Sequence, residues 1–336
     1  MLPRSSHMTA GLRPAYAALL LFAAFTLSCA APAELSRRSE AALAAGSDRQ
    51  AYEWAERANR SFELGVTRIA VLPFDDDTGV PGLAEELAVH AHGQLSANMP
   101  QKKFPFVRFV SEDAIAGRAR AEGRITREAA IRIGRSLGAT RVVWGRLHGL
   151  HSDTHTDTWH DRVFRKVAVR DSSNRTRVRY DEVSFETVSR EREVQVGWEF
   201  EVIETDEEET LVARSGAEQV TARTVFTRFD PSGDCDDYLL APPEWKSENA
   251  DGWKSAEKDW KQRYGDWSVP DFLEASHDTR DRGHYRRTDR ESYLNRSRPR
   301  VGADLPPAGD LAFLALREMV NPLWNVLKGL EREPAP

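Results

Sequence analysis

The side chains most able to do chemistry are concentrated between residues 148 and 161. They are His148, His151, His155 and His160, with Asp153, Asp157 and Asp161 among them. Imidazole nitrogens and carboxylate oxygens bind transition metals, so a metal-dependent hydrolase is one hypothesis. The spacing matches no established metal motif, however, and the threonines in between are typical of a polar connector between strands. We therefore favour a solvated connector, and we expect the chain to have no cofactor and no catalytic residue.

A second acidic group follows an apolar run. Asp75, Asp76 and Asp77 come directly after Phe74 and before Thr78. Acids beyond the carboxyl end of a strand can occupy the ligand-binding edge of an α/β sheet. No glycine-rich phosphate loop accompanies these acids, since the chain has neither G-x-G-x-x-G nor G-K-[ST]. We interpret the triplet as a solvated turn before a helix, whose N-terminus favours negative charge.

Four tryptophans recur later in the chain. Trp245, Trp253, Trp260 and Trp267 stand at spacings of eight, seven and seven residues. Helical heptads would place the last three on one face, although Gly265 is expected to break the last turn. One hypothesis is an aromatic platform for a glycan or a partner protein, and the other is a helix that packs its rings on a sheet. We favour packing.

The N-terminus indicates export and lipidation. Cys29 follows an uncharged apolar run of thirteen residues, 15–27, with arginines before it. A bilayer-spanning helix needs about 20 apolar residues, so this shorter run predicts a signal peptide over residues 1–28. Leu27-Ser28-Cys29 resembles a bacterial lipobox. The resemblance implies cleavage before Cys29 and its acylation with fatty chains such as palmitate, which give stable anchoring.

The neighbours of the two cysteines carry further information. Ala30, rather than Asp, follows Cys29. By resemblance to Gram-negative sorting signals, this favours the outer membrane. An ordinary secretory signal, cut near Ala31, is the alternative. Cys235 stands among aspartates, where negative charge opposes thiolate formation, so we expect an inert thiol and no intrachain disulfide.

Bulk composition limits the function classes. The 336 residues are 40% hydrophobic and 30% charged, a balance typical of a soluble, globular protein. The formal net charge of −6 gives no global attraction for nucleic acid, so we expect no nucleic-acid partner. Residues 29–65 are interpreted as the lipid anchor and a tether. A helix over 40–58 is expected there, interrupted near Gly46.

An α/β core is expected next, because apolar runs alternate with helical periodicity. The elements expected are strands at 66–74, 104–110 and 141–147 and helices at 81–97, 111–121 and 126–138. This order predicts a layered α/β sheet with flanking helices. Five further strands are expected to extend this sheet in antiparallel fashion. They lie at 162–170, 177–192, 194–203, 211–215 and 218–229.

The core resembles the CsgG-like superfamily of bacterial envelope proteins. The resemblance rests on residues 69–74, on the acidic turn, and on 137–139 before 142–145. This family includes lipoprotein activators of penicillin-binding proteins and the similar amino-terminal domain of the Tol–Pal translocation protein. The resemblance implies a non-enzymatic protein that assembles with periplasmic partners. The family's curli-secretion member donates hairpins to a membrane barrel. The hairpin over 161–192 carries too many arginines for a lipid face, and we expect it to stay in water.

The C-terminal third is less regular. Residues 230–309 form a Trp- and Arg-rich insertion. Within it, residues 278–300 hold eight arginines and are expected to form a mobile polar loop. A final helix capped by Asp310, kinked at Pro322, is expected within 310–330 and should pack on the core.

These observations favour one function and leave two others open. We expect a lipid-anchored, non-catalytic scaffold or adaptor on the periplasmic face of the outer membrane, acting in envelope assembly or secretion. It would bind envelope proteins through the tryptophan segment or an exposed sheet edge, and oligomerisation is possible. The first alternative is a peptidoglycan- or glycan-binding lipoprotein that uses Trp253 and Trp260. The second is the metal-dependent hydrolase.

Overall fold

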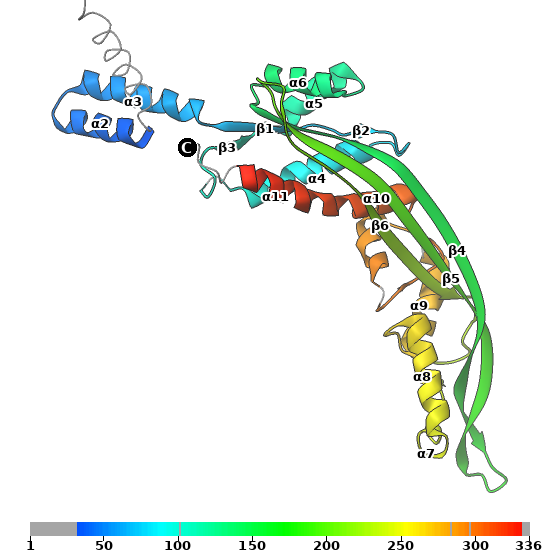
Figure 1. Ribbon diagram of the computed structural model, residues 1–336. Helices are drawn as coiled ribbons and strands as arrows, with labels where there is room; N and C mark the ends of the chain where they lie inside the picture. Colours follow the sequence, from blue (N-terminus) through cyan, green and yellow to red (C-terminus); the bar gives the residue numbers. More distant parts are fainter. Residues whose placement is uncertain (1–31, 101, 283, 296, 331–336) are drawn as a thin grey trace, which may run out of the picture. The chain divides into compact units, whose positions relative to one another are not determined.

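The computed structural model describes residues 32–100, 102–282, 284–295 and 297–330, in two compact units (Figure 1). The first unit comprises the chain up to Thr67 together with Gln101–Arg108, and the second comprises Arg68–Pro100 and the chain from Phe109 onward. The predicted signal peptide over 1–28 and the predicted lipidation of Cys29 lie outside the described residues.

The first unit is a helical hairpin. Helix α2 (Pro32–Ala44) and helix α3 (Asp48–Leu64) are joined by a tight turn in which Gly46 has a φ of 73°. Leu35 and Ala51 are buried, and the Ser39 hydroxyl donates to the Ala51 carbonyl at 2.8 Å. The expected break near Gly46 is confirmed, whereas α2 begins eight residues before the expected start at 40.

The second unit is built on a mixed, curled sheet, which confirms the predicted α/β fold with antiparallel extension. Its neighbouring strands follow the order β1-β4-β5-β6-β8. Strand β1 pairs parallel with β4, whereas β5 is antiparallel to both β4 and β6, and β8 pairs parallel with β6. The long strands are β1 (Thr67–Val71), β4 (Arg141–Arg170), β5 (Thr176–Glu204) and β6 (Thr210–Thr227). The short ones are β2 (Asp75–Asp76), β3 (Val107–Phe109), β7 (Tyr238–Leu239) and β8 (Arg300–Val301).

Helices cover both faces of the sheet at the end where β1 lies (Figure 1). On one face lie α5 (Glu112–Glu122) and α6 (Arg127–Ser136), and on the other lie α4 (Leu83–Asn98), α10 (Ala308–Leu316) and α11 (Val320–Leu330). Val142 and Trp144 pack into the core under α5 and α6, together with Ile131. Val143 and Leu147, which alternate with them, are equally buried. Successive residues of a strand point to opposite faces of the sheet, so this run of apolar residues gives both faces an apolar surface for helices to cover.

The strands are longer than the sequence predicts. The expected connector at 148–161 is part of β4, and the strands expected separately at 177–192 and 194–203 form the single strand β5. The connector prediction was wrong because continuous pairing with β5 satisfies the backbone of a polar segment. One irregularity interrupts that pairing. His148 faces Gly197 and His151 faces Gln195, so β4 carries one extra residue, a β-bulge at Gly149 (φ 63°).

A second core lies farther along the same strands. It joins Val163, Phe185 and Val225 of the sheet to Tyr264 and Phe272 of the helical insertion. The insertion contains α7 (Trp245–Glu248), α8 (Ala250–Tyr264) and α9 (Val269–Arg282), with 3₁₀ turns at Cys235–Asp237 and Arg287–Leu294.

Two expectations for the C-terminal third were wrong. Much of the predicted mobile loop at 278–300 has regular structure, because Arg290 pairs with Glu86 at 3.1 Å and ties the 3₁₀ turn to α4. The final helix is not kinked at Pro322. It is interrupted earlier, at Arg317–Met319, and Pro322 occupies the first turn of α11, where a missing N–H costs little.

Candidate functional site

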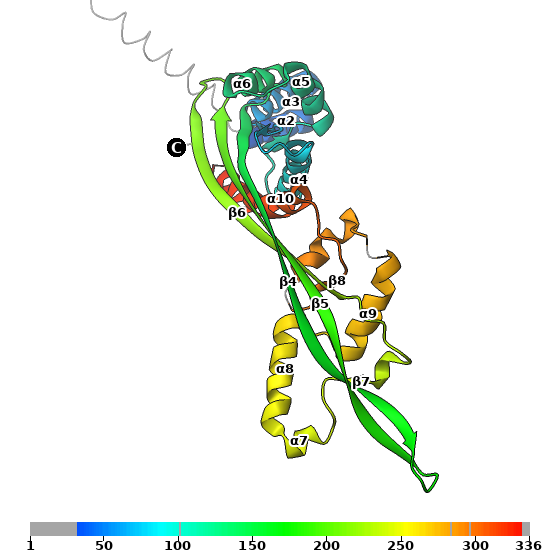
Figure 2. The ribbon, with the colours of Figure 1, turned by 90° about the vertical axis from the view of Figure 1, so that its right-hand side faces the viewer.

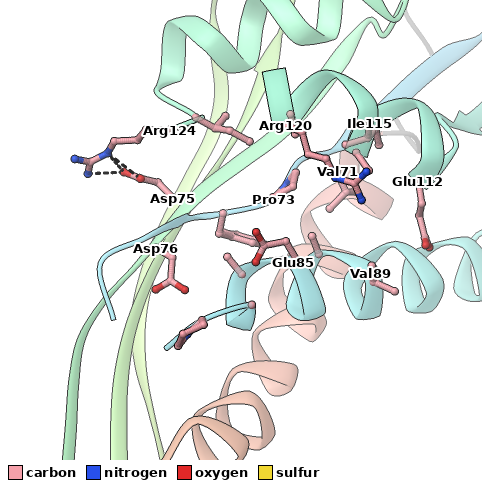
Figure 3. A pocket seen from close by; sticks show the side chains of 18 of the residues that line it. Val71, Pro73, Asp75, Asp76, Glu85, Val89, Glu112, Ile115, Arg120 and Arg124 are labelled. Atoms are coloured by element: carbon pink, nitrogen blue, oxygen red, sulfur yellow. Dashed lines mark hydrogen bonds and ion pairs between the residues drawn. The ribbon is translucent and has the colours of Figure 1, made fainter. Parts of the chain in front are cut away.

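A groove of about 820 Å³ opens between α4 and α5, beyond the carboxyl end of β1 (Figure 3). The chain leaves β1 at Val71 and passes Pro73. It then runs beside β4, where Asp75 faces Arg146. Ligands of α/β sheets commonly bind beyond the carboxyl ends of strands. The position of this groove makes it the candidate site.

The walls of the groove are apolar and its rim is charged. The apolar lining includes Val71, Val80, Ala88, Val89, Ile115 and Ala116. Val89 on α4 is 54% exposed, a large exposed fraction for an apolar side chain that lines a groove. The charged lining residues are Asp75, Asp76, Asp77, Glu85, Glu112, Asp113, Arg120 and Arg124. Carboxylates outnumber cations, so the rim is acidic.

Asp75 is the buried acid of this site, at 7% exposure. Arg124 donates to both of its carboxylate oxygens, from Nε at 2.9 Å and from Nη2 at 2.8 Å, and Arg146 Nε adds a bond at 3.2 Å. The bond to Asp75 raises the pKa of the Arg124 guanidinium, with the negative charges of Asp75 and Asp77 adding to it. The interpretation of the triplet as a solvated turn was therefore wrong for Asp75, which anchors two distant arginines.

The remaining acids have separate roles. Asp76 accepts from the backbone N–H of Thr78 at 2.8 Å and from its hydroxyl at 2.6 Å, which holds the turn. Asp77 is exposed, and its Oδ1 lies 3.3 Å from Arg124 Nη2, the same nitrogen that bonds Asp75. His92 on α4 has both ring nitrogens engaged, Nδ1 with Glu112 at 2.9 Å and Nε2 with the Val110 carbonyl at 3.0 Å. Most titratable groups near the groove therefore already have partners within the chain.

The four histidines proposed as metal ligands are spread along β4. All of His148, His151, His155 and His160 are exposed. A strand rises about 3.3 Å per residue, so the first and last of them stand roughly 40 Å apart and cannot share an ion. His155 bonds Asp157 at 2.8 Å. Among the residues that the structure describes, no group of three His, Cys, Asp or Glu could hold a metal.

Asp161, from the same sequence cluster, is a buried structural residue. Its carboxylate accepts from the Tyr264 hydroxyl and from Arg263 Nη1, the latter at 2.5 Å. The Tyr264 hydroxyl also bonds Thr187 at 2.8 Å and accepts from Trp159 Nε1 at 3.1 Å. Burial, with the charge of Asp161, raises the pKa of the Tyr264 phenol. This network attaches α8 to the middle of the β4–β5 hairpin.

The tryptophans contact their own chain. Trp260 is 6% exposed and donates to the Trp267 carbonyl at 2.6 Å. Trp267 lies beyond the end of α8, where Gly265 (φ 62°) stops the helix, and it donates to the Pro299 carbonyl at 2.8 Å. The break at Gly265 is confirmed. Trp260 packs in the second core and offers no surface for a ligand.

The other two rings are half-buried. Trp245 packs edge-on against Phe164, with ring centroids 5.4 Å apart. Trp253 lies beneath the Lys246 ammonium, 4.5 Å from its ring centroid. Cys235 lies at the border of the second core. In the described part of the chain, no helix combines the length and apolar character needed to cross a bilayer.

Comparison with known proteins yields only weak structural similarity. No family model and no curated protein matches the chain. A PelC dodecamer from Paraburkholderia phytofirmans is 16% identical with a TM-score of 0.24, over 50% of this chain and 76% of that one. Lipoprotein GNA1162 from Neisseria meningitidis is 7% identical with a TM-score of 0.25, over 50% of this chain and 88% of that one. The LpoB C-terminal domain from Salmonella enterica is 14% identical with a TM-score of 0.23, over 46% of this chain and 82% of that one. The weak structural neighbours thus include a lipoprotein, and scores this low carry no argument about binding or activity.

Proposed function

We propose that this chain is a non-catalytic scaffold of the bacterial cell envelope that docks a partner protein in the groove between α4 and α5. The proposal includes anchoring at the periplasmic face of the outer membrane through lipid on Cys29, and relationship of the 66–150 core to the CsgG-like superfamily. The observation that carries it is the groove itself, whose apolar wall includes the exposed Val89 and whose rim is acidic. A contiguous apolar surface with a polar rim is the usual form of a protein-binding site.

The chemistry of the groove favours binding over catalysis. A general base needs a lone pair directed at substrate. The carboxylate of Asp75 is occupied by Arg124 and Arg146, and both nitrogens of His92 already have partners. These groups hold the walls in place. They are poorly suited to abstracting a proton.

The rim also indicates the chemistry of the partner. Glu85 on α4 and Asp113 on α5 are exposed carboxylates on opposite sides of the groove, with the apolar wall between them. A segment with apolar side chains flanked by Lys or Arg would bury its apolar surface against Val89 and place its cations at the rim. Complementary charge accelerates association and excludes acidic competitors.

Photo-cross-linking in cells tests this function. A photoreactive residue placed at Val89 should give discrete adducts with a protein partner, and Glu85→Lys should remove them by reversing the charge of the rim. Leu43, an apolar position on α2 that is 61% exposed, is the matched control. Equal adducts at both positions, or adducts indifferent to Glu85→Lys, would contradict docking in the groove.

Anchoring is tested separately. Metabolic labelling with palmitate should mark the wild-type chain and leave Cys29→Ser unlabelled, and a high-salt wash should release the variant, but not the wild type, from the membrane fraction. Equal labelling and equal membrane retention of the two proteins would contradict the proposed lipid anchor. The groove proposal would be unaffected.

A further inference from the structure

The far end of the β4–β5 hairpin is a two-stranded finger. Strand β7 pairs with β4 at Phe164 and Arg165, and past this point β4 and β5 pair only with each other among the described residues. We define the finger as residues 166–180, which extend past α7 in Figure 2. A two-stranded ribbon contributes little stability of its own, so the core does not require its side-chain contacts and its side chains can bind a ligand.

The turn at the tip of the finger is well formed. Asp171 Oδ1 accepts from the backbone N–H groups of Ser173 and Arg175, both at 2.9 Å. Asn174 takes a left-handed conformation at φ 60°, which asparagine tolerates. The tip therefore holds a defined shape and a fixed cross-strand register.

That register sorts the side chains of the finger into two faces. Directly opposed residues of antiparallel strands share a face. One face holds the pairs Lys166–Tyr180, Ala168–Val178 and Arg170–Thr176, and the other holds Val167–Arg179 and Val169–Arg177. We call the first the cationic face, because it contains Lys166 and Arg170 and no acid.

The two faces differ in how their charges are matched. On the second face, Arg177 pairs with Asp171 at 3.0 Å and Arg179 pairs with Asp181 at 2.6 Å. Lys166 and Arg170 on the cationic face, and Arg175 at the turn beside it, are exposed and have no ion-pair partner among the described residues. The unmatched positive charge is thus concentrated on one side of the finger and at its tip.

The cationic face also exposes apolar surface. Val178 is 51% exposed, Ala168 is exposed, and Tyr180 is half-buried at the base of the finger. Valine and tyrosine between basic residues form the pattern that settles at a membrane interface. The apolar groups enter the headgroup boundary, the phenol stays at its polar level, and the cations meet lipid phosphates.

We propose that the cationic face of the finger binds the surface of an anionic phospholipid bilayer, as a peripheral contact that does not span it. The chain carries a net charge of −6, which repels any polyanion at long range, so the local basic patch acts only at close approach, within about a Debye length. The exposed Val178 gains from an interface and gains nothing from a duplex backbone. This contact is distinct from the groove and from Cys29, and it goes beyond the proposed function.

Vesicle partitioning tests the inference. The full chain with Cys29→Ser serves as the common background, so that its N-terminal segment contributes equally to every measurement. Partitioning into mixed phosphatidylglycerol–phosphatidylcholine vesicles is compared with that into pure phosphatidylcholine. Each basic residue at such a surface is worth about fivefold in affinity, so Lys166→Gln/Arg170→Gln/Arg175→Gln should weaken the anionic binding roughly a hundredfold. High salt should weaken the parent similarly.

Two further variants make the result specific. Arg118→Gln/Lys254→Gln/Lys258→Gln removes three exposed cations elsewhere in the same unit, and should leave the binding unchanged despite the same change in net charge. Lys166→Arg/Arg170→Lys/Arg175→Lys keeps the charge and should retain the binding. Unchanged thermal unfolding of the neutralised finger variant shows that both cores are intact.

Three outcomes would overturn the proposal. The first is equal partitioning of the parent into anionic and neutral vesicles. The second is a neutralised finger that binds as the parent does, or a control triple that loses binding equally. The third is displacement of the parent from the vesicles by a short DNA duplex or a polyglutamate peptide at a lower concentration than by soluble anionic lipid, which would assign the face to another anion. None of these results bears on cross-linking at Val89.

Discussion

The two ends of the β4–β5 hairpin use similar residues in opposite ways. Near Arg141 the strands are covered on both faces and their arginines are matched, since Arg141 pairs with Glu204 at 3.2 Å and Arg146 with Asp75 at 3.2 Å. At the finger the strands are bare, and Lys166 and Arg170 face water unmatched. An arginine met by a carboxylate contributes to folding, whereas one left without a carboxylate remains available for a ligand. The covered end of the hairpin therefore contributes to the stability of the fold, whereas the finger presents cations for binding.

Core truncation should give the largest difference between the two ends. Leu147 is fully buried in the covered part of β4, so Leu147→Ala should lower the free energy of unfolding by about 3 kcal/mol. Val169→Ala in the finger should lower it by less than about 0.5 kcal/mol, because little packs against it. Denaturant unfolding measures both. An equal cost at the two positions would mean that the finger belongs to the cooperative fold.

The buried network at Tyr264 marks where the covered part ends. Tyr264→Phe removes the hydroxyl that bonds Asp161 and Thr187 and accepts from Trp159, and should cost about 2 kcal/mol. Thermal and denaturant unfolding measure this cost. If the variant unfolds like the wild type, the network does not hold α8 to the hairpin.

The same variant should alter the response to alkaline pH. Burial raises the pKa of Tyr264 above its ordinary value of 10.0, so the folded chain retains a proton that the unfolded chain loses. The stabilisation is complete below pH 10.0 and declines as the pH rises above it. The melting temperature should therefore fall less steeply above about pH 10 in Tyr264→Phe than in the wild type. Parallel curves would contradict this role for Tyr264.

Matched carboxylate changes give the smallest and sharpest comparison. Asp75→Asn removes the charge that Arg124 and Arg146 share, and should cost about 1 kcal/mol, since both arginines are partly exposed. Asp171→Asn at the tip keeps the acceptor for the Ser173 and Arg175 N–H groups and removes only the ion pair with Arg177, so it should leave global unfolding unchanged. Global destabilisation by Asp171→Asn would show that the ends are not independent.

Local patterns predicted the elements near β1 well. The predicted cap Thr126 accepts from the Ala129 N–H at 3.3 Å, and the alternation from Val194 to Val202 matches their burial. These features depend on residues close in sequence. The partners of Asp75 lie 49 and 71 positions away, so no local pattern could reveal that its carboxylate is buried.

The polar parts of β4 and β5 are the strands that the sequence pattern does not predict. The segment around Thr154 and Thr156 is exposed on both sides, so it lacks the apolar alternation by which strands are recognised. Its strand character depends on pairing with β5, a non-local interaction. The same holds for the finger. The sequence shows an excess of arginine there, but the pairing of Arg177 with Asp171 joins two different strands and follows only from the cross-strand register.

The extra residue at Gly149 determines where the finger is aimed. A bulge bends its strand and sharpens the local twist, while the ladder on either side stays in register. Deleting that residue would preserve the β4–β5 pairs on both sides of the bulge. It would remove the bend and so change the direction in which the finger points. Loss of the single codon for Gly149 would therefore change the direction of the finger without a substitution in either core.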